Sequence, residues 1–300
     1  MSSPGFTLWM EGVQSRVEAA LDRLLPAATI APARLHQSMR YAALGGGKRV
    51  RPLLAFAAAE VSGADPARVD VAASAVECIH AFSLVHDDMP CMDDDVLRRG
   101  RPTVHVEYDE ATALLAGDSL QTFAFQLLAE HQLCDDPRDQ LEMVRILGHA
   151  SGSRGMAGGQ AIDLEAVGKS LTQAELEFMH IHKTGAVIRA AVALGARCGG
   201  GRRLSTAELD ELDRYAKYVG LAFQVVDDVL DCITPSVTLG KTAGKDAANN
   251  KPTYVSLLGL GEAKALAHEL RDQAVARLAG FGERGLRLTE LADFVAKREF

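Results

Sequence analysis

The chain has 300 residues, and its 32 lysines and arginines against 40 aspartates and glutamates give a formal net charge of −8, which argues against a nucleic-acid-binding protein. Hydrophobic residues make up 48% of the chain, too many for a disordered protein, yet no apolar run approaches the roughly 20 residues that span a bilayer. The five cysteines form no CxxC pair and the N-terminal residues do not resemble a signal peptide, so we expect a cytoplasmic protein with reduced thiols and no membrane span.

The predicted elements are helices, because aromatic residues make up only 5% of the chain and apolar residues recur at helical spacing. Helix starts are marked by Asp65 before a proline, and by Thr172 with Glu175, which fit a capping box. In chain order, we expect helices at residues 6–25, 33–44, 53–62, 66–89, 109–131, 139–152, 172–197, 205–233, 253–279 and 285–297.

Two stretches inside these helices, 71–85 and 218–230, are apolar on nearly every side, which is typical of interior helices. No linker, low-complexity tract or repeat divides the chain. The sequence therefore predicts an all-α fold, a large helical bundle in which residues 1–300 form a single domain.

An acidic cluster lies at the end of each of two apolar helices. One lies in LVHDDMPCMDDD (84–95) and the other in FQVVDDVLD (223–231), where Asp227 and Asp231 are four residues apart and share one helical face. Like charges at that spacing repel each other and destabilise a helix unless a cation offsets them. Mg²⁺ binds carboxylate oxygens together with waters and substrate phosphates. The clusters therefore predict a magnesium site, in preference to two solvated acidic helix ends.

Two basic segments accompany the acidic clusters. GGGKRVRP (45–52) places three cations beside three glycines, and RRGRP (98–102) follows the first acidic cluster directly. Arginine forks bind phosphate bidentately, and glycines let the backbone approach it closely. The first segment lacks the spacing of a Walker A loop, and taken alone it also fits a helix C-cap whose cations complement the helix dipole. Together the acidic and basic segments indicate a site for a metal–phosphate pair.

At this point the chain resembles the trans-isoprenyl diphosphate synthases, all-α enzymes of the class I isoprenoid synthase fold with the active site in a central cavity. The resemblance covers nearly the whole chain and is closest to the bacterial farnesyl diphosphate synthases (geranyltranstransferases), which carry two extra residues in the first acidic motif, here Pro90 and Cys91. The segments that carry it are, in order, GGGKRVRP, LVHDDMPCMDDDVLRRGRPTVH, GMAGGQAIDL, HKTG, FQVVDDVLD and GKTAGKDAANNKPTY.

The resemblance implies roles for residues at matching motif positions. Three Mg²⁺ ions, or Mn²⁺ in their place, are expected to bind Asp87, Asp93 and Asp227, with Asp88 and Asp231 nearby. The residues expected to hold the allylic diphosphate are Arg98, Lys183, Lys241 and Lys251. The residues expected to hold isopentenyl diphosphate are Lys48, Arg51, His80 and Arg99. The oxygens expected to face the developing carbocation belong to Thr184 and Gln224, and the supporting polar motif contributes Gln160 and Asp163.

The implied reaction condenses isopentenyl diphosphate with dimethylallyl or geranyl diphosphate to give farnesyl diphosphate, and a homodimer is expected. Lys183, Thr184, Gln224, Arg98 and Lys241 form the expected catalytic set. Phe82 and Ser83 lie five and four residues before Asp87, which at about 1.5 Å per residue is roughly 6–8 Å along the helix axis. The resemblance implies that bulk at these two positions limits product length and that a phenylalanine at the first of them fits a C15 product.

Four alternatives remain beside this interpretation. A geranylgeranyl diphosphate synthase would differ only in product length. A class I terpene cyclase needs Asn/Asp, Ser/Thr and Glu at steps of four, whereas Asp231 and Pro235 follow Asp227 here. A metal-dependent phosphohydrolase with a His-Asp motif would explain His86 but needs further spaced histidines. A non-catalytic subunit of a heteromeric synthase would be expected to lack an acidic motif, and both are intact.

Overall fold

In the computed structural model of the chain, residues 4–233 and 252–297 are described, and this part is almost wholly helical. A single two-stranded antiparallel hairpin pairs Leu97 with Pro102 and Arg98 with Arg101 within these ranges. The elements are α1 (Pro4–Leu24), α2 (Ala33–Ala43), α3 (Val50–Ser62), α4 (Pro66–Asp87), β1 (Leu97–Arg98), β2 (Arg101–Pro102), α5 (Val104–Glu107), α6 (Glu110–Glu130), α7 (Pro137–Ser151), α8 (Met156–Ala166), α9 (Gln173–His180), the π-helix η1 (Ile181–Gly185), α10 (Ala186–Arg197), α11 (Thr206–Ile233), α14 (Tyr254–Leu258), α15 (Leu260–Ala276), the 3₁₀-helix η2 (Ala279–Gly285) and α16 (Leu286–Ala296).

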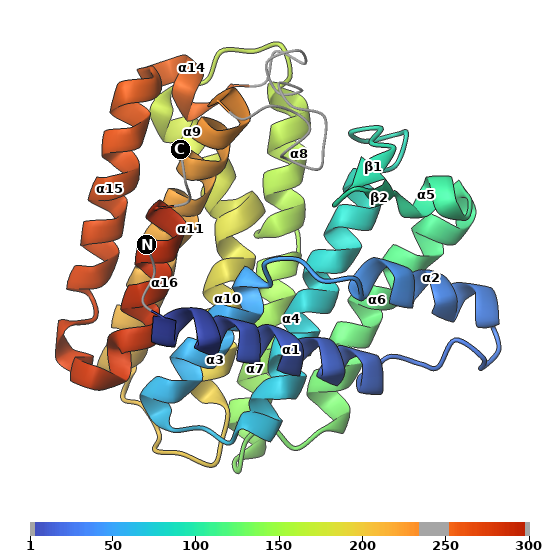
Figure 1. Cartoon of the computed structure of the whole chain (residues 1–300), viewed down its shortest axis with the longest axis horizontal. Coiled ribbons are helices and arrows are strands. Elements are labelled where there is room, and N and C mark those ends of the chain that lie inside the picture. Colours follow the sequence, from blue (N-terminus) through green and yellow to red (C-terminus); the bar gives the residue numbers. More distant parts are fainter. Residues whose placement is uncertain (1–3, 234–251, 298–300) are drawn as a thin grey trace.

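The helices α4 and α10 form the centre of the bundle, as the apolar stretch 71–85 predicts. α4 packs against α3, α6 and α10, and α10 packs in turn against α3, α7 and α11. In Figure 1, α15 and α16 flank one side of this centre, α2 and α6 flank the other, and α1 crosses the bundle at a steep angle. The buried side chains of these helices form one large hydrophobic core, with a small second cluster around Val85. The all-α expectation is confirmed.

The helix α4 differs from the sequence expectation in one respect. It is long and apolar enough to cross a membrane by length and composition, and no other helix among the described residues passes that test. In the fold, 72% of its most apolar window is buried, as in the core helix of a bundle. Its two buried acids, Asp70 and Glu77, pair with arginines of neighbouring elements.

Two expected helices are divided in the structure, and α5, α8 and most of η2 lie outside the expected ranges. The stretch 172–197 contains α9, the π-helix η1 and α10, and the stretch 253–279 is divided at Gly259, whose φ of 81° ends α14. The helix α8 was missed because its Gly158 and Gly159 lower helix propensity. A Cβ on Gly159 would lie 2.1 Å from the Lys183 backbone nitrogen, so this glycine lets α8 pack directly on η1.

Candidate active site

A cavity of about 640 Å³ opens between α4, α8, η1 and α11, next to the segment that carries β1. It contains most of the residues that the sequence analysis singled out. Those lining it are Arg51, His80, Phe82, Ser83, Asp87, Arg98, Arg99, Lys183, Thr184, Gln224 and Asp227, together with Gln160 of the supporting motif. Lys48, Asp88, Asp93 and Asp231 do not line it. Lys241 and Lys251 lie outside the described residues.

The two acidic motifs meet at this cavity. Asp87 is the last residue of α4 and Asp227 lies in the final turns of α11, so two helix ends bring a carboxylate each to the same space. Burial raises the pKa of Asp87 to about 6, although the Lys183 charge opposes the shift. The Asp93 backbone N–H donates to the Asp87 carbonyl oxygen at 2.9 Å, which folds the first motif back on the end of its helix. Among the described residues, no group of three or more His, Cys, Asp or Glu side chains is placed to hold a metal ion.

Asp88 and Asp228, the second aspartate of each motif, are buried and accept hydrogen bonds from other residues of the protein. Asp88 accepts hydrogen bonds from the Arg98 guanidinium, with 3.0 Å from Nε to Oδ1. Asp228 accepts one hydrogen bond from the Tyr254 backbone N–H at 2.8 Å and another from the Gln224 amide at 3.1 Å. These contacts hold Arg98 and Gln224 in place at the cavity wall.

Basic side chains from several elements line the cavity. They include Arg51 at the start of α3, His80 of α4 and Arg99 of the β1–β2 turn. Burial, with the nearby arginine charges, holds the pKa of His80 well below its usual value, so its ring is neutral and can donate one hydrogen bond. Lys183 of the π-helix η1 also lines the cavity, and its ammonium donates to Asp163 at 2.6 Å.

The side chains of Thr184 and Gln224 contact each other at the cavity wall. The Thr184 hydroxyl donates to the Gln224 Oε1 at 3.2 Å, and the Gln224 amide is fixed in turn by Asp228. Beside them, the buried amide atoms of Gln160 have no hydrogen-bond partner within residues 4–233 and 252–297. Polar groups that are buried without partners are costly, so the Gln160 amide is a candidate ligand-binding group.

Phe82, Ser83 and His86 of α4 line the same cavity. The Phe82 and His86 rings contact each other edge to face with centroids 5.7 Å apart, and the His86 Nε2 lies 3.1 Å from the Leu114 carbonyl oxygen. Space for the His86 ring depends on Gly117 of α6, where a Cβ would lie 2.1 Å from that nitrogen.

Sequence reasoning missed several apolar residues of the cavity wall. They are Met92, Met156, Ala157, Ala161, Leu164 and Phe223. The signal was present in the segment GMAGGQAIDL, which carries the resemblance but was not expected to form a helix. Carboxylates, cations and apolar side chains all line this cavity, which suits a ligand with an ionic head joined to a hydrocarbon chain.

Comparison with known proteins agrees with this geometry. The family model of Polyprenyl synthetase matches residues 32–278. The chain is 46% identical to the farnesyl diphosphate synthase of Escherichia coli (strain K12) over 299 residues, which cover 98% of this chain and 99% of that protein. It is also 46% identical to a chloroplastic geranylgeranyl pyrophosphate synthase of Capsicum annuum over 267 residues, which cover 88% of this chain and 72% of that protein.

A solved structure gives the same result for the fold. The geranyltransferase of Helicobacter pylori, complexed with magnesium and isoprenyl diphosphate, is similar with a TM-score of 0.84 and 32% sequence identity, over 98% of this chain and 97% of that chain. Because the family model matches most of the chain and the relatives match nearly all of it, the chain belongs to the polyprenyl synthetase family.

Proposed function

We propose that the chain is a farnesyl diphosphate synthase, a transferase that joins isopentenyl diphosphate to dimethylallyl or geranyl diphosphate. The observation that carries this proposal is the cavity that Asp87 and Asp227 line together with Arg51, Arg99, Lys183 and apolar side chains. The similarity to the farnesyl diphosphate synthase of Escherichia coli supports it over nearly the full length of both chains.

The donor set fits Mg²⁺. This ion usually binds proteins through one or two carboxylates plus waters and substrate phosphates, and Asp87 and Asp227 face a cavity rich in phosphate-binding cations. We assign Asp93 to the same site as a third ligand, and Asp88 and Asp231 as neighbours. The Helicobacter pylori geranyltransferase complexed with magnesium and isoprenyl diphosphate supports this choice of metal. We assign three such ions to the site, the number that the resemblance implies, with Mn²⁺ as a substitute.

The side chains divide the work of the reaction. When bound, Mg²⁺ offsets the negative charge on the diphosphate leaving group. Lys183 and Arg98 hold this diphosphate from the protein side, so positive charge is already in place as the allylic C–O bond breaks. Asp163 keeps the Lys183 ammonium oriented through its 2.6 Å hydrogen bond. Lys241 and Lys251 are assigned to the same diphosphate.

The second substrate completes the reaction. Lys48, Arg51, His80 and Arg99 hold isopentenyl diphosphate, whose double bond attacks the allylic carbon and forms the new C–C bond. The Thr184 and Gln224 oxygens face the positive charge that passes through this region. A proton then leaves the isopentenyl unit for the departing diphosphate, which restores a double bond. The apolar wall excludes water, which would otherwise trap the cation as an alcohol.

Product length depends on the size of the cavity. Phe82 is buried in α4 and, with Ser83 and His86, limits the room for the growing chain, so we assign a C15 product. The second candidate is a geranylgeranyl diphosphate synthase, favoured by the equal 46% identity to the Capsicum annuum protein.

We further propose that the enzyme is a cytoplasmic homodimer built from one domain of residues 1–300. The support for the dimer is an apolar surface on α5 and α6, where Val106, Leu114 and Leu115 are about half exposed. Burying such side chains against a second copy would remove apolar area from water.

The experiment that tests the proposed site compares two aspartates of α11. Asp227→Ala should lower turnover with geranyl and isopentenyl diphosphates by about a hundredfold or more, because it removes a carboxylate that would hold the Mg²⁺ offsetting the leaving-group charge. Asp210→Ala, an exposed position on the same helix outside the cavity, is the matched control and should keep turnover within about twofold. Equal turnover in the two variants would contradict the assignment of Asp227.

A further inference from the structure

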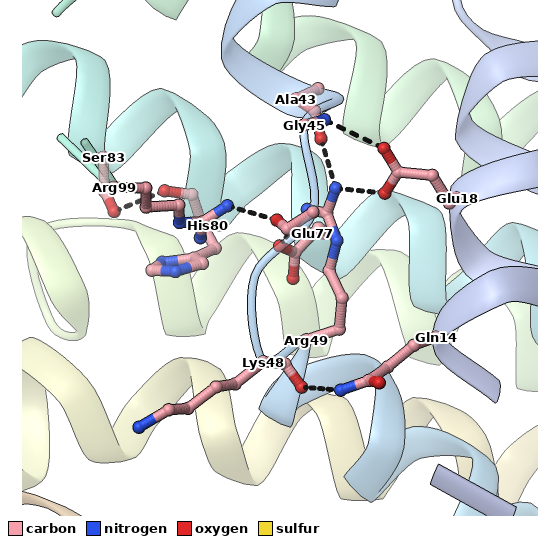
Figure 2. A network of polar contacts seen from close by, with 11 residues as sticks. Gln14, Glu18, Ala43, Gly45, Lys48, Arg49, Glu77, His80, Ser83 and Arg99 are labelled. Atoms are coloured by element: carbon pink, nitrogen blue, oxygen red, sulfur yellow. Dashed lines mark hydrogen bonds and ion pairs between the residues drawn. The ribbon is translucent and has the colours of Figure 1, made fainter. Parts of the chain in front are cut away.

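A cluster of charged residues holds the loop 44–49, which joins α2 to α3. The Arg49 guanidinium donates to Glu77 of α4 at 2.5 Å, to Glu18 of α1 at 2.6 Å and to the Ala43 carbonyl oxygen at 2.7 Å (Figure 2). The Arg49 and Glu77 side chains are each 2% exposed. We call Arg49, Glu77 and Glu18 the triad. Burying the Arg49–Glu77 ion pair costs desolvation free energy, so its presence points to a role beyond solubility.

The triad holds an unusual loop conformation. Gly45, Gly46 and Gly47 have φ values of 117°, 77° and 110°, and Arg49 itself has a left-handed φ of 48°, which disfavours residues with a Cβ. Three contacts of its guanidinium with Glu77, Glu18 and the Ala43 carbonyl oppose the return of Arg49 to an ordinary conformation.

The same contacts fix both ends of the loop to α1. The Gly45 N–H donates to Glu18 at 2.9 Å, and the Gln14 amide, one helical turn earlier, donates to the Lys48 carbonyl oxygen at 3.0 Å. With its backbone held on that side, the Lys48 side chain extends away from Glu18, toward the side of the view where His80 and Arg99 lie (Figure 2). Glu18 of the triad and its neighbour Gln14 therefore hold the loop backbone from which the Lys48 side chain extends.

Arg99 contacts the loop 44–49 directly. Its guanidinium donates to the Gly46 carbonyl oxygen at 2.6 Å, and a Cβ on Gly47 would lie 2.8 Å from the same guanidinium. Because Arg99 also lines the cavity, a change in the loop would move a cavity cation.

The triad also supplies negative charge to a cationic region. Lys48, Arg49 and Arg51 lie at or just before the start of α3, and Arg99 of the β1–β2 turn contacts the loop 44–49, so these cations repel each other before any diphosphate is bound. The pKa of Glu18 lies below its usual value. Burial raises this pKa, but the hydrogen bonds from the Gly45 N–H and Arg49 lower it by more, so the carboxyl is ionised at neutral pH. Together with Glu77 it offsets part of the repulsion.

We propose that Arg49, Glu77 and Glu18 are positioning residues for isopentenyl diphosphate: they hold the loop 44–49 in the conformation that gathers Lys48, Arg51 and Arg99 around one diphosphate. The inference rests on the proposed function, and it assigns to the triad an effect on only one of the two substrates. The allylic diphosphate is assigned to Arg98, whose guanidinium Asp88 holds, and to Lys183 of η1, whose ammonium Asp163 holds.

The test uses two variants and one matched control. Glu18→Gln and Glu77→Gln keep the shape of each side chain and remove its charge. Asp70→Asn is the control, because Asp70 lies two helical turns before Glu77 on α4, is equally buried, and pairs with Arg16 of α1 at 2.5 Å without touching the loop. Steady-state kinetics of full-length protein with Mg²⁺ give KM for each substrate, and thermal unfolding gives the stability of each variant.

The expected result is a rise of about tenfold in KM for isopentenyl diphosphate in both triad variants, the size of one weakened charge-assisted hydrogen bond. KM for geranyl diphosphate should stay within about twofold, and Asp70→Asn should lower the melting temperature while both KM values stay within about twofold. If Glu77→Gln fails to fold, Glu18→Gln still decides, because its side chain is 37% exposed and easier to replace.

Other outcomes overturn the inference. An unchanged KM for isopentenyl diphosphate in Glu18→Gln, equal rises for both substrates, or the same selective rise in Asp70→Asn would show that the triad only stabilises the fold. Failure of the wild-type protein to consume isopentenyl diphosphate would instead contradict the proposed function, so the two failures are distinguishable.

Discussion

Replacing Phe82 by alanine should lengthen the product. Phe82 lies five residues before Asp87 on α4, so its Cα is about 7.5 Å from that carboxylate residue along the helix axis. Its ring lines the cavity and contacts the His86 ring edge to face, at a centroid distance of 5.7 Å. A phenyl ring is comparable in size to one isoprene unit, so its removal should admit one further condensation. We expect the main product to change from C15 to C20.

The assay is chromatography of the alcohols released from the products by phosphatase, after incubation with isopentenyl and geranyl diphosphates. Phe82→Ala should also cost stability, at the lower end of the scale for a buried phenylalanine, about 3 kcal/mol, because one face of its ring already borders a cavity. Phe123→Ala on α6 is the matched control, since Phe123 is equally buried but does not line the cavity, and its product should remain C15. An identical product distribution in wild type and Phe82→Ala would refute the assignment of Phe82 as the residue that limits product length.

Three further predictions follow from the site and its surroundings. Gly117→Ala should push the His86 ring into the cavity, because the new Cβ would lie 2.1 Å from Nε2, and product analysis should then show shorter chains than in wild type. Lys183→Ala should lower kcat and raise KM for geranyl diphosphate while KM for isopentenyl diphosphate changes little; a selective effect on the isopentenyl side would mean that the two sites are exchanged. Burial lowers the pKa of His180 to about 3, so below pH 6.5 the unfolded chain binds a proton that the folded protein does not, and stability falls on acidification by about 1.4 kcal/mol per pH unit. His180→Phe keeps the ring stacked on Tyr254 and should abolish about 2 kcal/mol of the loss between pH 6.5 and 5 in urea unfolding; an unchanged pH dependence would exclude this ring as its source.

Local signals in the sequence predicted the helices well. Asp65 accepts from the Ala67 N–H, and Thr172 with Glu175 forms the expected capping box, because both patterns depend on neighbours only a few residues away. The two acidic motifs were likewise found because each closes an apolar helix, and the structure brings Asp87 and Asp227 to one cavity.

Features that depend on distant neighbours were not predicted. The glycines of α8 look like helix breakers until Gly159 is seen against the backbone of Lys183. In the sequence, Arg49 resembles the phosphate-binding cations beside it. In the fold, it pairs with Glu77 and Glu18, which lie 28 and 31 residues away in the sequence. A lone glutamate in the apolar stretch 71–85 was the available signal for this contact, since a buried carboxylate needs a partner.

The central claim is that this cavity makes farnesyl diphosphate from isopentenyl and allylic diphosphates. The most direct measurement incubates the purified wild-type protein with dimethylallyl and isopentenyl diphosphates, with Mg²⁺ or with a chelator, and identifies the dephosphorylated products by chromatography. We predict farnesol as the main alcohol, formed only when Mg²⁺ and the allylic substrate are both present. A main product of C20 would contradict the chain length, and no consumption of isopentenyl diphosphate, or a hydrocarbon formed without it, would contradict the function itself.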